Sequence, residues 1–523
     1  MEILGVLVGS DEGWIRLGGY ELSAVEKEIA HRAAQGLPYA GGDSPPDPIY
    51  EIQGTIDADF IVELLLGLID GWSWHPNGLH LQNCRISGPL SLSGASFRRQ
   101  RPDRAVMPFC CENVFFEQPV DFSYATTNRI TLQKCWFPEF TARGADIATG
   151  LTLDDCVVHG GDAAGQQTGG HHHGIDLDGS TIGGDFSAKR LCYSRLDCPR
   201  QLSETRARSR LGPVANAHVL IDADNLKISG GVDLSATWRN GPACPTDRRA
   251  AVLMGNFDNA EVFGDFRAIG TEFAPIQLED TGTAGDTTQR RRKCLDLRGA
   301  QIRGDLELDY ISTAGEIHLE DATLTQDVSF GGARLVNVDC DSGTSGVVIE
   351  AMGLAIGGSL HLVDRRHTGD LLISGRPTDG EPKAQERSAD RDVRFTAIGQ
   401  VRLARSRIEG DLDASGATIC AVGQAVEGVA LDLRSGELGG SLYLDARRDV
   451  GPGLFIGLVN LINMRVGGSV IFTGSWFRAP ACQQMGPQRV HLQVLHERPG
   501  DEQGVAVPHD CPDEEQCASA MRD

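Results

Sequence analysis

Aspartates that recur at fixed places are the residues with the clearest chemical potential. Some lie in pairs after an apolar residue and others follow glycine at corners: Asp176, Asp178, Asp222, Asp224, Asp185, Asp265, Asp305 and Asp411. Carboxylates aligned on a β-structure form the sites of polysaccharide hydrolases, where two of them act together. A Gly-Asp pair that recurs in many repeats is also ordinary turn chemistry, and we prefer that interpretation. The sequence therefore predicts no enzyme and no catalytic residue, with a carbohydrate-active enzyme as an alternative.

The histidine cluster and the absence of cofactor motifs also predict no catalytic site. His171, His172 and His173 follow two glycines, and three adjacent histidines in an extended chain cannot all face one metal ion. We therefore expect an exposed loop there and no metal site. The sequence has no phosphate loop, dinucleotide motif, H-E-x-x-H, zinc-type Cys/His spacing or G-x-S-x-G elbow, so it predicts no cofactor.

Clustered arginines are the remaining candidates. Such side chains suit an anionic partner, nucleic acid included, because guanidinium groups bind carboxylates and phosphates in pairs of hydrogen bonds. In the alternative interpretation they pair with acidic residues of the same chain. The candidate partner-binding residues are Arg206, Arg208, Arg210, Arg248, Arg249, Arg290, Arg291, Arg292, Lys293, Arg365, Arg366, Arg447 and Arg448.

A repeat of eleven residues must position all of these side chains. Its template is L-x-L-x-G-A-x-I-x-G-D, as in the units that begin at Leu295 and Leu306. Apolar-x-apolar alternation is typical of short half-buried strands, and glycine supplies the turns. Two units make a coil of 22 residues, the separation of Leu295 and Ile317. Around Ile130 the spacing falls to ten, and the pattern does not give the phase there.

The fold class that follows is an all-β solenoid. We predict a parallel β-helix of about 12–13 coils with a small N-terminal helical cap, right-handed by analogy with most such helices. Strands stacked about 4.8 Å apart would give a rod of about 60 Å. Small residues should stack from coil to coil and form the core with the apolar residues that follow them: Cys84, Ala95, Cys135, Ala145, Cys156, Ser180, Ala300, Ala322 and Ala417.

Three domains are expected. Residues 1–75 form a helical cap, with a capping box at Ser23–Glu26 before a helix over 26–35 and a second helix over 57–69. Its simplest role is to shield the first coil, and docking or dimerisation is the alternative. Residues 76–477 form the β-helix. Residues 478–523 form a C-terminal cover, with an edge strand at Val490–Leu495, and a disordered acidic tail.

Insertions interrupt the repeat at nearly one phase. They span about 189–218, 236–252, 269–293, 364–392 and 445–457, and they contain most of the clustered arginines. Equal phase in a solenoid means the same side, so we expect long loops on one edge, the usual binding face of a repeat protein.

The net charge and the cysteine pattern limit the possible partners and the cellular location. The net charge of −24 disfavours nucleic-acid binding by the body of the rod and keeps open an acidic DNA mimic. The simpler interpretation is solubility of a long stacked sheet. No secretory signal or membrane-length apolar run is visible, and fourteen cysteines are scattered without C-x-x-C pairs. We therefore predict a cytoplasmic location and no membrane span.

The repeat resembles that of a bacterial β-helical family with L-x-L-x-G-A-x-I-x-G-x-L-x-L units after a short helical segment. Residues Ile56–Leu66, followed by the unit that begins at Gly78, carry the resemblance, which extends to about Phe477. Members are often loosely labelled membrane-associated oxidoreductases, but this sequence contains neither a cofactor motif nor a membrane segment that would support the label. The chain is also similar in architecture to pentapeptide-repeat proteins, some of which mimic DNA and bind topoisomerases. No functional residue is carried over from either.

The function expected is therefore that of a non-enzymatic bacterial scaffold. Its one-sided arginine-rich loops would bind a macromolecular partner, most simply a protein, within a multi-protein complex. The alternatives are an acidic DNA-mimic inhibitor, nucleic-acid binding through the loops, and a carbohydrate-active enzyme. The sequence predicts neither the identity of the partner nor the oligomeric state.

Overall fold

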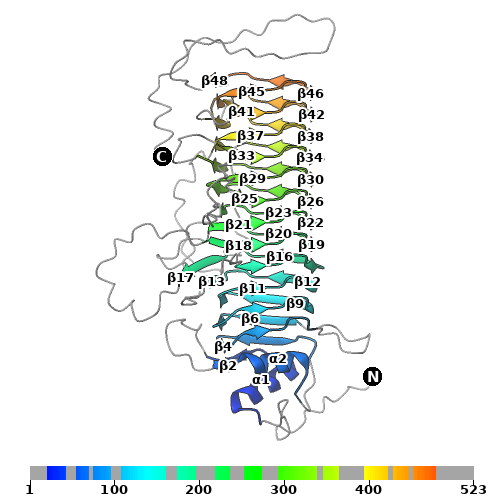
Figure 1. Cartoon of the computed structure of the whole chain (residues 1–523), viewed down its shortest axis with the longest axis vertical. Helices are drawn as coiled ribbons and strands as arrows, with labels where there is room; N and C mark the ends of the chain where they lie inside the picture. Colours follow the sequence, from blue (N-terminus) through cyan, green and yellow to red (C-terminus); the bar gives the residue numbers. More distant parts are fainter. Residues whose placement is uncertain are drawn as a thin grey trace, which may run out of the picture.

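The chain forms one long stack of β-coils with two helices at its N-terminal end (Figure 1). The computed structural model describes residues 21–42, 55–69, 75–95, 108–160, 174–195, 218–235, 252–273, 293–338, 346–363, 394–421, 428–446 and 451–478. Within these residues every strand pairing is parallel, and each joins one coil to the next. The chain is an all-β parallel β-helix, as the repeat predicted.

Four rows of strands run along the rod, numbered here in the order in which the chain passes through them in one coil. Row 1 contains β5 (Leu90–Ser91), β8 (Val120–Asp121), β11 (Phe140–Thr141), β14 (Ile175–Asp176), β18 (His218–Asp222), β21 (Val252–Asn256), β25 (Lys293–Asp296), β29 (Glu316–His318), β33 (Val347–Glu350), β37 (Gln400–Arg402), β41 (Val429–Asp432) and β45 (Leu458–Asn460). Row 2 contains β15 (Thr181–Ile182), β19 (Lys227–Ile228), β22 (Glu261–Val262), β26 (Gln301–Ile302), β30 (Thr323–Leu324), β34 (Ala355–Ile356), β38 (Arg407–Ile408), β42 (Glu437–Leu438) and β46 (Arg465–Val466).

Row 3 continues the sheet of row 2. It contains β3 (Leu79–Gln82), β6 (Pro108–Glu112), β9 (Thr126–Gln133), β12 (Asp146–Thr152), β16 (Asp185–Ser187), β20 (Val232–Asp233), β23 (Phe266–Arg267), β27 (Leu306–Glu307), β31 (Val328–Ser329), β35 (Leu360–His361), β39 (Leu412–Asp413), β43 (Leu442–Tyr443) and β47 (Val470–Ile471). The long strands β9 and β12 span rows 2 and 3 together.

Row 4 lies between row 3 and the next coil. It contains β4 (Arg85–Ser87), β7 (Phe115–Phe116), β10 (Trp136–Phe137), β13 (Val157–Gly160), β17 (Cys192–Arg195), β24 (Glu272–Phe273), β28 (Ser312–Thr313), β32 (Arg334–Val336), β36 (Thr396–Ile398), β40 (Thr418–Cys420), β44 (Leu454–Ile456) and β48 (Trp476–Arg478).

The register confirms the predicted coil. In row 3, twelve successive pairings connect thirteen equivalent residues from Leu79 to Val470. Leu295 pairs with Ile317 in row 1, so this coil consists of two repeat units, as predicted. The coil from Val120 to Phe140 is shorter still, which was not predicted. Ile130 pairs with Phe109 and Leu151, which places the irregular step in row 3 and settles its phase. Handedness stays a prediction.

Turns with left-handed backbone separate the rows. In most of them a residue with positive φ precedes a buried residue, as at Gly179 (φ 65°) before Ser180 and Asn225 (φ 55°) before Leu226. Glycine and asparagine tolerate this conformation, which explains the Gly-Ala step of the template. The predicted small-residue stack is in fact two stacks: Ala145 and Ser180 follow row 1, whereas Cys135 and Cys156 follow row 3.

Gly-Asp corners join rows 2 and 3 by stacking directly on the coil below. A Cβ on Gly184 would lie 1.8 Å from the Thr149 carbonyl oxygen, so only glycine fits there. The aspartate that follows accepts a hydrogen bond from the backbone of the next coil: Asp265 Oδ1 from Asp305 N at 3.0 Å, and Asp305 Oδ1 from Asp327 N at 3.1 Å. These aspartates are therefore part of the stacking, as expected from turn chemistry.

The N-terminal cap covers the first coil. Helix α1 (Ala24–Gln35) has the predicted capping box between Ser23 and Glu26 and ends at Gly36. Helix α2 (Ala58–Leu66) begins after Asp57 and ends at Gly67, so it is shorter than predicted and Leu68 lies beyond it, partly exposed. Strands β1 (Tyr39–Ala40) and β2 (Thr55–Asp57) pair with β3 and β4 and continue the ladders into the cap.

Candidate partner-binding edge

The two halves of a coil differ in how strictly their length is kept. From row 1 to row 3 the chain takes a single repeat unit in every coil from Phe140 to Val470, and we call this half the constant leg. From row 3 back to row 1 the length varies. It is a single repeat unit between Leu306 and Ile317 but nearly four times as long between Leu360 and Val401. This second half is the variable leg, so extra sequence enters the rod on one side.

The breaks between described ranges follow the same division. Those at 161–173, 196–217, 236–251, 274–292, 339–345, 364–393, 422–427 and 447–450 all fall on the variable leg. The side of the rod formed by row 4 and the re-entry into row 1 is called the loop edge below. One break, 96–107, lies on the constant leg between β5 and β6. Its four arginines were missed in the sequence analysis, because the repeat is irregular near the cap.

Of the thirteen candidate partner-binding residues, only Lys293 lies within the described ranges. Arg206, Arg208, Arg210, Arg248, Arg249, Arg290, Arg291, Arg292, Arg365, Arg366, Arg447 and Arg448 lie outside them. Two other basic residues assigned to the first insertion belong to the rod. Lys189 Nζ lies 2.9 Å from Asp233 Oδ2, and Arg190 forms an ion pair with Asp155.

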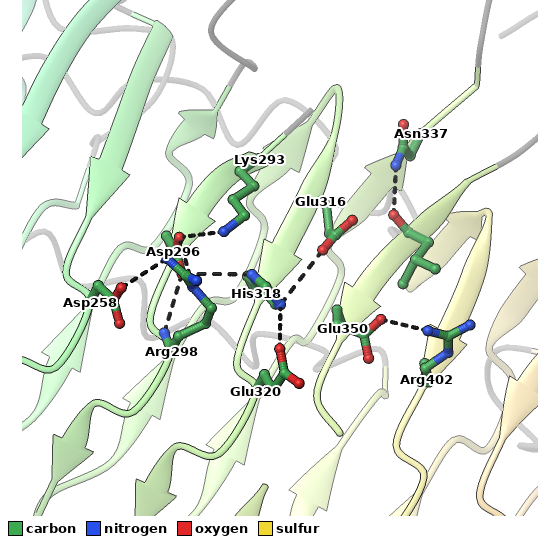
Figure 2. A network of polar contacts seen from close by, with 11 residues as sticks. Asp258, Lys293, Asp296, Arg298, Glu316, His318, Glu320, Asn337, Glu350 and Arg402 are labelled. Atoms are coloured by element: carbon green, nitrogen blue, oxygen red, sulfur yellow. Dashed lines mark hydrogen bonds and ion pairs between the residues drawn. The ribbon is translucent and has the colours of Figure 1, made fainter. Parts of the chain in front are cut away.

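A strip of charged side chains lies where the variable leg re-enters row 1. We call it the charged strip, and it lies on or directly after β25, β29, β33 and β37 (Figure 2). Its members are Lys293, Asp296, Arg298, Glu316, His318, Glu320, Glu350 and Arg402. Parallel register aligns these positions from coil to coil, which brings Arg298 to Asp258 and Arg402 to Glu350 across 40 and 52 residues of sequence.

Asp296 is the centre of the lower part of the strip. Lys293 Nζ donates to its Oδ2 at 2.9 Å and Arg298 Nε to its Oδ1 at 2.8 Å, while Arg298 Nη2 reaches Asp258 Oδ2 at 2.8 Å. Burial alone would raise the pKa of Asp296, but the hydrogen bonds and charges of Arg298 and Lys293 outweigh it and hold the pKa below the usual value. The Asp296 carboxylate in turn raises the pKa of Arg298. This part is a rigid, charge-compensated anchor.

His318 occupies the next coil among carboxylates. Its ring is only 2% exposed, with Nε2 3.3 Å from Glu320 Oε2 and 3.9 Å from Glu316 Oε1, and Nδ1 3.8 Å from Asp296 Oδ1. Figure 2 shows the imidazole between Asp296 on one side and the two glutamates on the other. One coil further, Arg402 Nη1 donates to the buried Glu350 at 2.9 Å. Row 1 thus presents Asp296, His318, Glu350 and Arg402 in four successive coils.

Signs of the charges change along row 1. In row 1 each inward-facing residue, such as Ile175 or Leu295, is followed by an outward-facing one. From coil to coil these outward-facing residues are Asp176, Asp222, Asn256, Asp296, His318, Glu350, Arg402, Asp432 and Asn460. In the acidic lower part the pKa of Asp224 is raised by burial and then by Asp258, Asp178 and Asp222. Basic side chains interrupt the upper part, so row 1 has no continuous negative stripe within the described coils. Aligning the repeats on the constant leg would have identified His318 and Arg402 as departures from aspartate.

Three aspartates on the row 3 face are held by neighbouring groups. A shallow hollow of about 440 Å³ over row 3 is lined by Asp185, Asp233 and Asp265 among others. Asp233 is paired with Lys189, Asp265 Oδ2 lies 2.7 Å from Arg267 Nη2, and Asp185 Oδ1 accepts from Gly231 N at 2.9 Å. These bonds hold the carboxylates in the stacking of coils.

The described residues contain no group of three or more His, Cys, Asp or Glu able to hold a metal ion, and His171–His173 lie outside them. None of their helices is long and apolar enough to cross a membrane. Comparison with protein-family models, with curated proteins and with solved structures finds no match.

Proposed function

We propose that this chain is a non-enzymatic scaffold that binds a macromolecular partner, a protein, along its loop edge. The observation that carries the proposal is the contrast between the two legs of the coil. From Leu151 onward, extra sequence enters every variable leg except that between Leu306 and Ile317, whereas the constant leg keeps the length of one repeat unit from Phe140 onward. Purely structural drift would lengthen either leg, since surface loops cost little wherever they are inserted. One-sided insertion is the pattern of a repeat protein with a binding face.

The charged strip supports the same proposal. Its ion pairs lie at the stems of the variable legs and tie neighbouring coils together, as Arg298 ties Asp258 to Asp296. A rigid base of this kind lowers the ordering cost of binding, because the stems of the binding segments are already placed. The arginines of the variable legs then supply contacts to acidic groups of the partner.

A cytoplasmic location belongs to the proposal. Seven described cysteines are free thiols, and six of them are buried in the core of the rod. Burial raises the pKa of the Cys294 thiol to about 12. Thiols used as core residues suit a reducing compartment.

The test uses the full-length chain, tagged at its native level in its own cells. Replacing Arg290, Arg291 and Arg292 together by glutamate should reduce the amount of specific protein partner per molecule of bait at least tenfold. The matched control reverses three exposed charges of the row 2 face, Lys227→Glu, Arg303→Glu and Arg407→Glu, and should leave recovery unchanged.

Three outcomes would contradict the proposal. Recovery of no specific partner by the wild-type chain would remove the scaffold. Equal loss in both triple variants would show a general charge effect and not a loop-edge site. Loss of the bound material after nuclease treatment would identify nucleic acid as the partner.

A further inference from the structure

The two ends of the rod are built differently. At the N-terminal end, β1 and β2 extend the ladders and α2 packs over the first coil, with Ile61 and Leu64 fully buried. At the other end the coil formed by β45, β46, β47 and β48 is the last one described, and Figure 1 shows these strands at the top of the stack with no described helix over them. The core of the last coil therefore differs from that of every inner coil.

Exposure shows the difference directly. Core positions of the preceding coil are buried, with Leu431, Leu442 and Phe455 all 0% exposed. Their partners in register, Val459, Val470 and Phe477, are only partly buried. Leu458 and Ile462 are 50% and 54% exposed. An apolar surface thus crosses the whole end of the rod.

Backbone groups at this end also point away from the stack. In the preceding coil, Leu442 N donates to Ser469 O and Leu444 N to Ile471 O, each at 2.8 Å. The equivalent N–H groups, those of Val470 and Phe472, have no such acceptor among the described residues. Such an end is a template for one more strand, and natural proteins cover edges of this kind.

We propose that residues 479–523 of the same chain cover this end, with Val490–Leu495 adding a strand to the last coil. The segment begins directly after β48, so it is tethered at the surface it would cover, which raises its effective concentration. Val490 lies twelve positions after Arg478, a reach of about 40 Å when extended, enough to arrive at any row of a coil. In Val490-His-Leu-Gln-Val-Leu495 the apolar residues alternate, as a half-buried strand requires.

Charge favours this occupant over a second copy of the rod end. Residues 458–478 contain Arg465 and Arg478 and no Asp or Glu, in a chain whose net charge is −24. Arg465 forms an ion pair with Glu437 of the preceding coil at 3.1 Å, yet 82% of its side chain stays exposed at the end of the rod. Residues 479–523 contain eight Asp and Glu and three Arg, a net charge of −5. A basic apolar end and an acidic segment attract each other, whereas two copies of the end would bring like charges together.

The test is hydrogen exchange on the full-length chain at low micromolar concentration. We expect the 458–478 peptides to exchange as slowly as the inner peptide 431–445. Replacing the core-side residues Leu492 and Val494 by lysine should speed exchange of the 458–478 peptides at least tenfold and leave 295–330 unchanged, which shows that the rod remains folded. The matched control, His491→Lys with Gln493→Lys on the opposite face, should change neither.

Each other outcome overturns the proposal. Fast exchange at 458–478 in the wild-type chain would mean that the end is open. Slow exchange that persists in the Leu492→Lys, Val494→Lys variant would mean that another element covers it. Protection that rises with concentration together with a dimer in light scattering would identify a second copy as the occupant.

Discussion

At the scale of single residues, most of the distinctive side chains serve stacking. Gly184 lies against the backbone of the coil below, the corner aspartates accept backbone hydrogen bonds from the coil above, and Asp296 joins Lys293 and Arg298. Residues that resemble catalytic carboxylates in the sequence are thus bound into the rod. Two substitutions test whether these contacts stabilise it.

Gly184→Ala should destabilise the rod, because its new Cβ would lie 1.8 Å from the Thr149 carbonyl oxygen. We expect a loss of about 1–3 kcal/mol in the free energy of unfolding, the usual cost of overpacking. Gly42→Ala is the matched control, since no atom lies within 4 Å of its added Cβ, and it should be neutral. Chemical denaturation of the three chains measures both, and equal midpoints would contradict the close stacking at this corner.

Asp296→Asn should weaken the charged strip in a pH-dependent way. Because the folded state holds the pKa of Asp296 below its unfolded value, the unfolded state binds the proton first as pH falls. The stabilisation is therefore present above the unfolded pKa, about 4, and is lost as pH falls through the folded pKa. At pH 7 the variant should lose about 1–3 kcal/mol, and its stability should fall less than that of wild type below pH 4. Parallel stability–pH curves would contradict this role.

At the scale of elements, the constant and variable legs of each coil should differ in how well they tolerate inserted residues. The variable leg should accept an insertion that the constant leg does not. Six Gly/Ser residues placed between Ala314 and Gly315, on a variable leg of one repeat unit, should cost under about 1 kcal/mol, since loop closure depends weakly on length. The same insert between Gln326 and Asp327, on a constant leg, should cost about 3 kcal/mol or more, because several ladder hydrogen bonds of about 1 kcal/mol each are lost, including that from Asp327 N to Asp305. Similar costs at both sites would show that the one-sidedness has no structural basis.

The coil length, the strand positions and the first helix cap could be predicted from the sequence. Core positions such as Leu295 and Leu306 recur because every coil presents the same environment at the same place, so the period gave the coil length and the strand positions. The capping box at Ser23 was equally local. The repeat could not give the separation of the small residues into two stacks, because both units of a coil share one template and only the structure shows which row each unit follows. The alignment of His318 with Asp296 and Glu350 could have been predicted, because the constant legs that begin at Leu295, Ile317 and Ile349 have equal length.

At the scale of the whole molecule, the rod is asymmetric in three respects. One end has a helical cap and the other has a half-exposed last coil, one leg is constant and the other varies, and row 1 is acidic in its lower part and mixed in its upper part. A segment that covers the C-terminal end of the rod accounts for the difference between the two ends. A scaffold that holds a partner along one edge accounts for the difference between the constant and the variable legs. The rod would then place the partner's contacts at intervals set by the coils.

The most direct measurement is a hydroxyl-radical footprint of the full-length chain in complex with its co-purified partner. Protection should map to the loop edge, in peptides 274–298 and 364–402, while the exposed row 2 side chains at Lys227, Arg303 and Arg407 keep the reactivity of the free chain. Protection centred on row 2, with the variable legs unchanged, would contradict the assignment of the binding face.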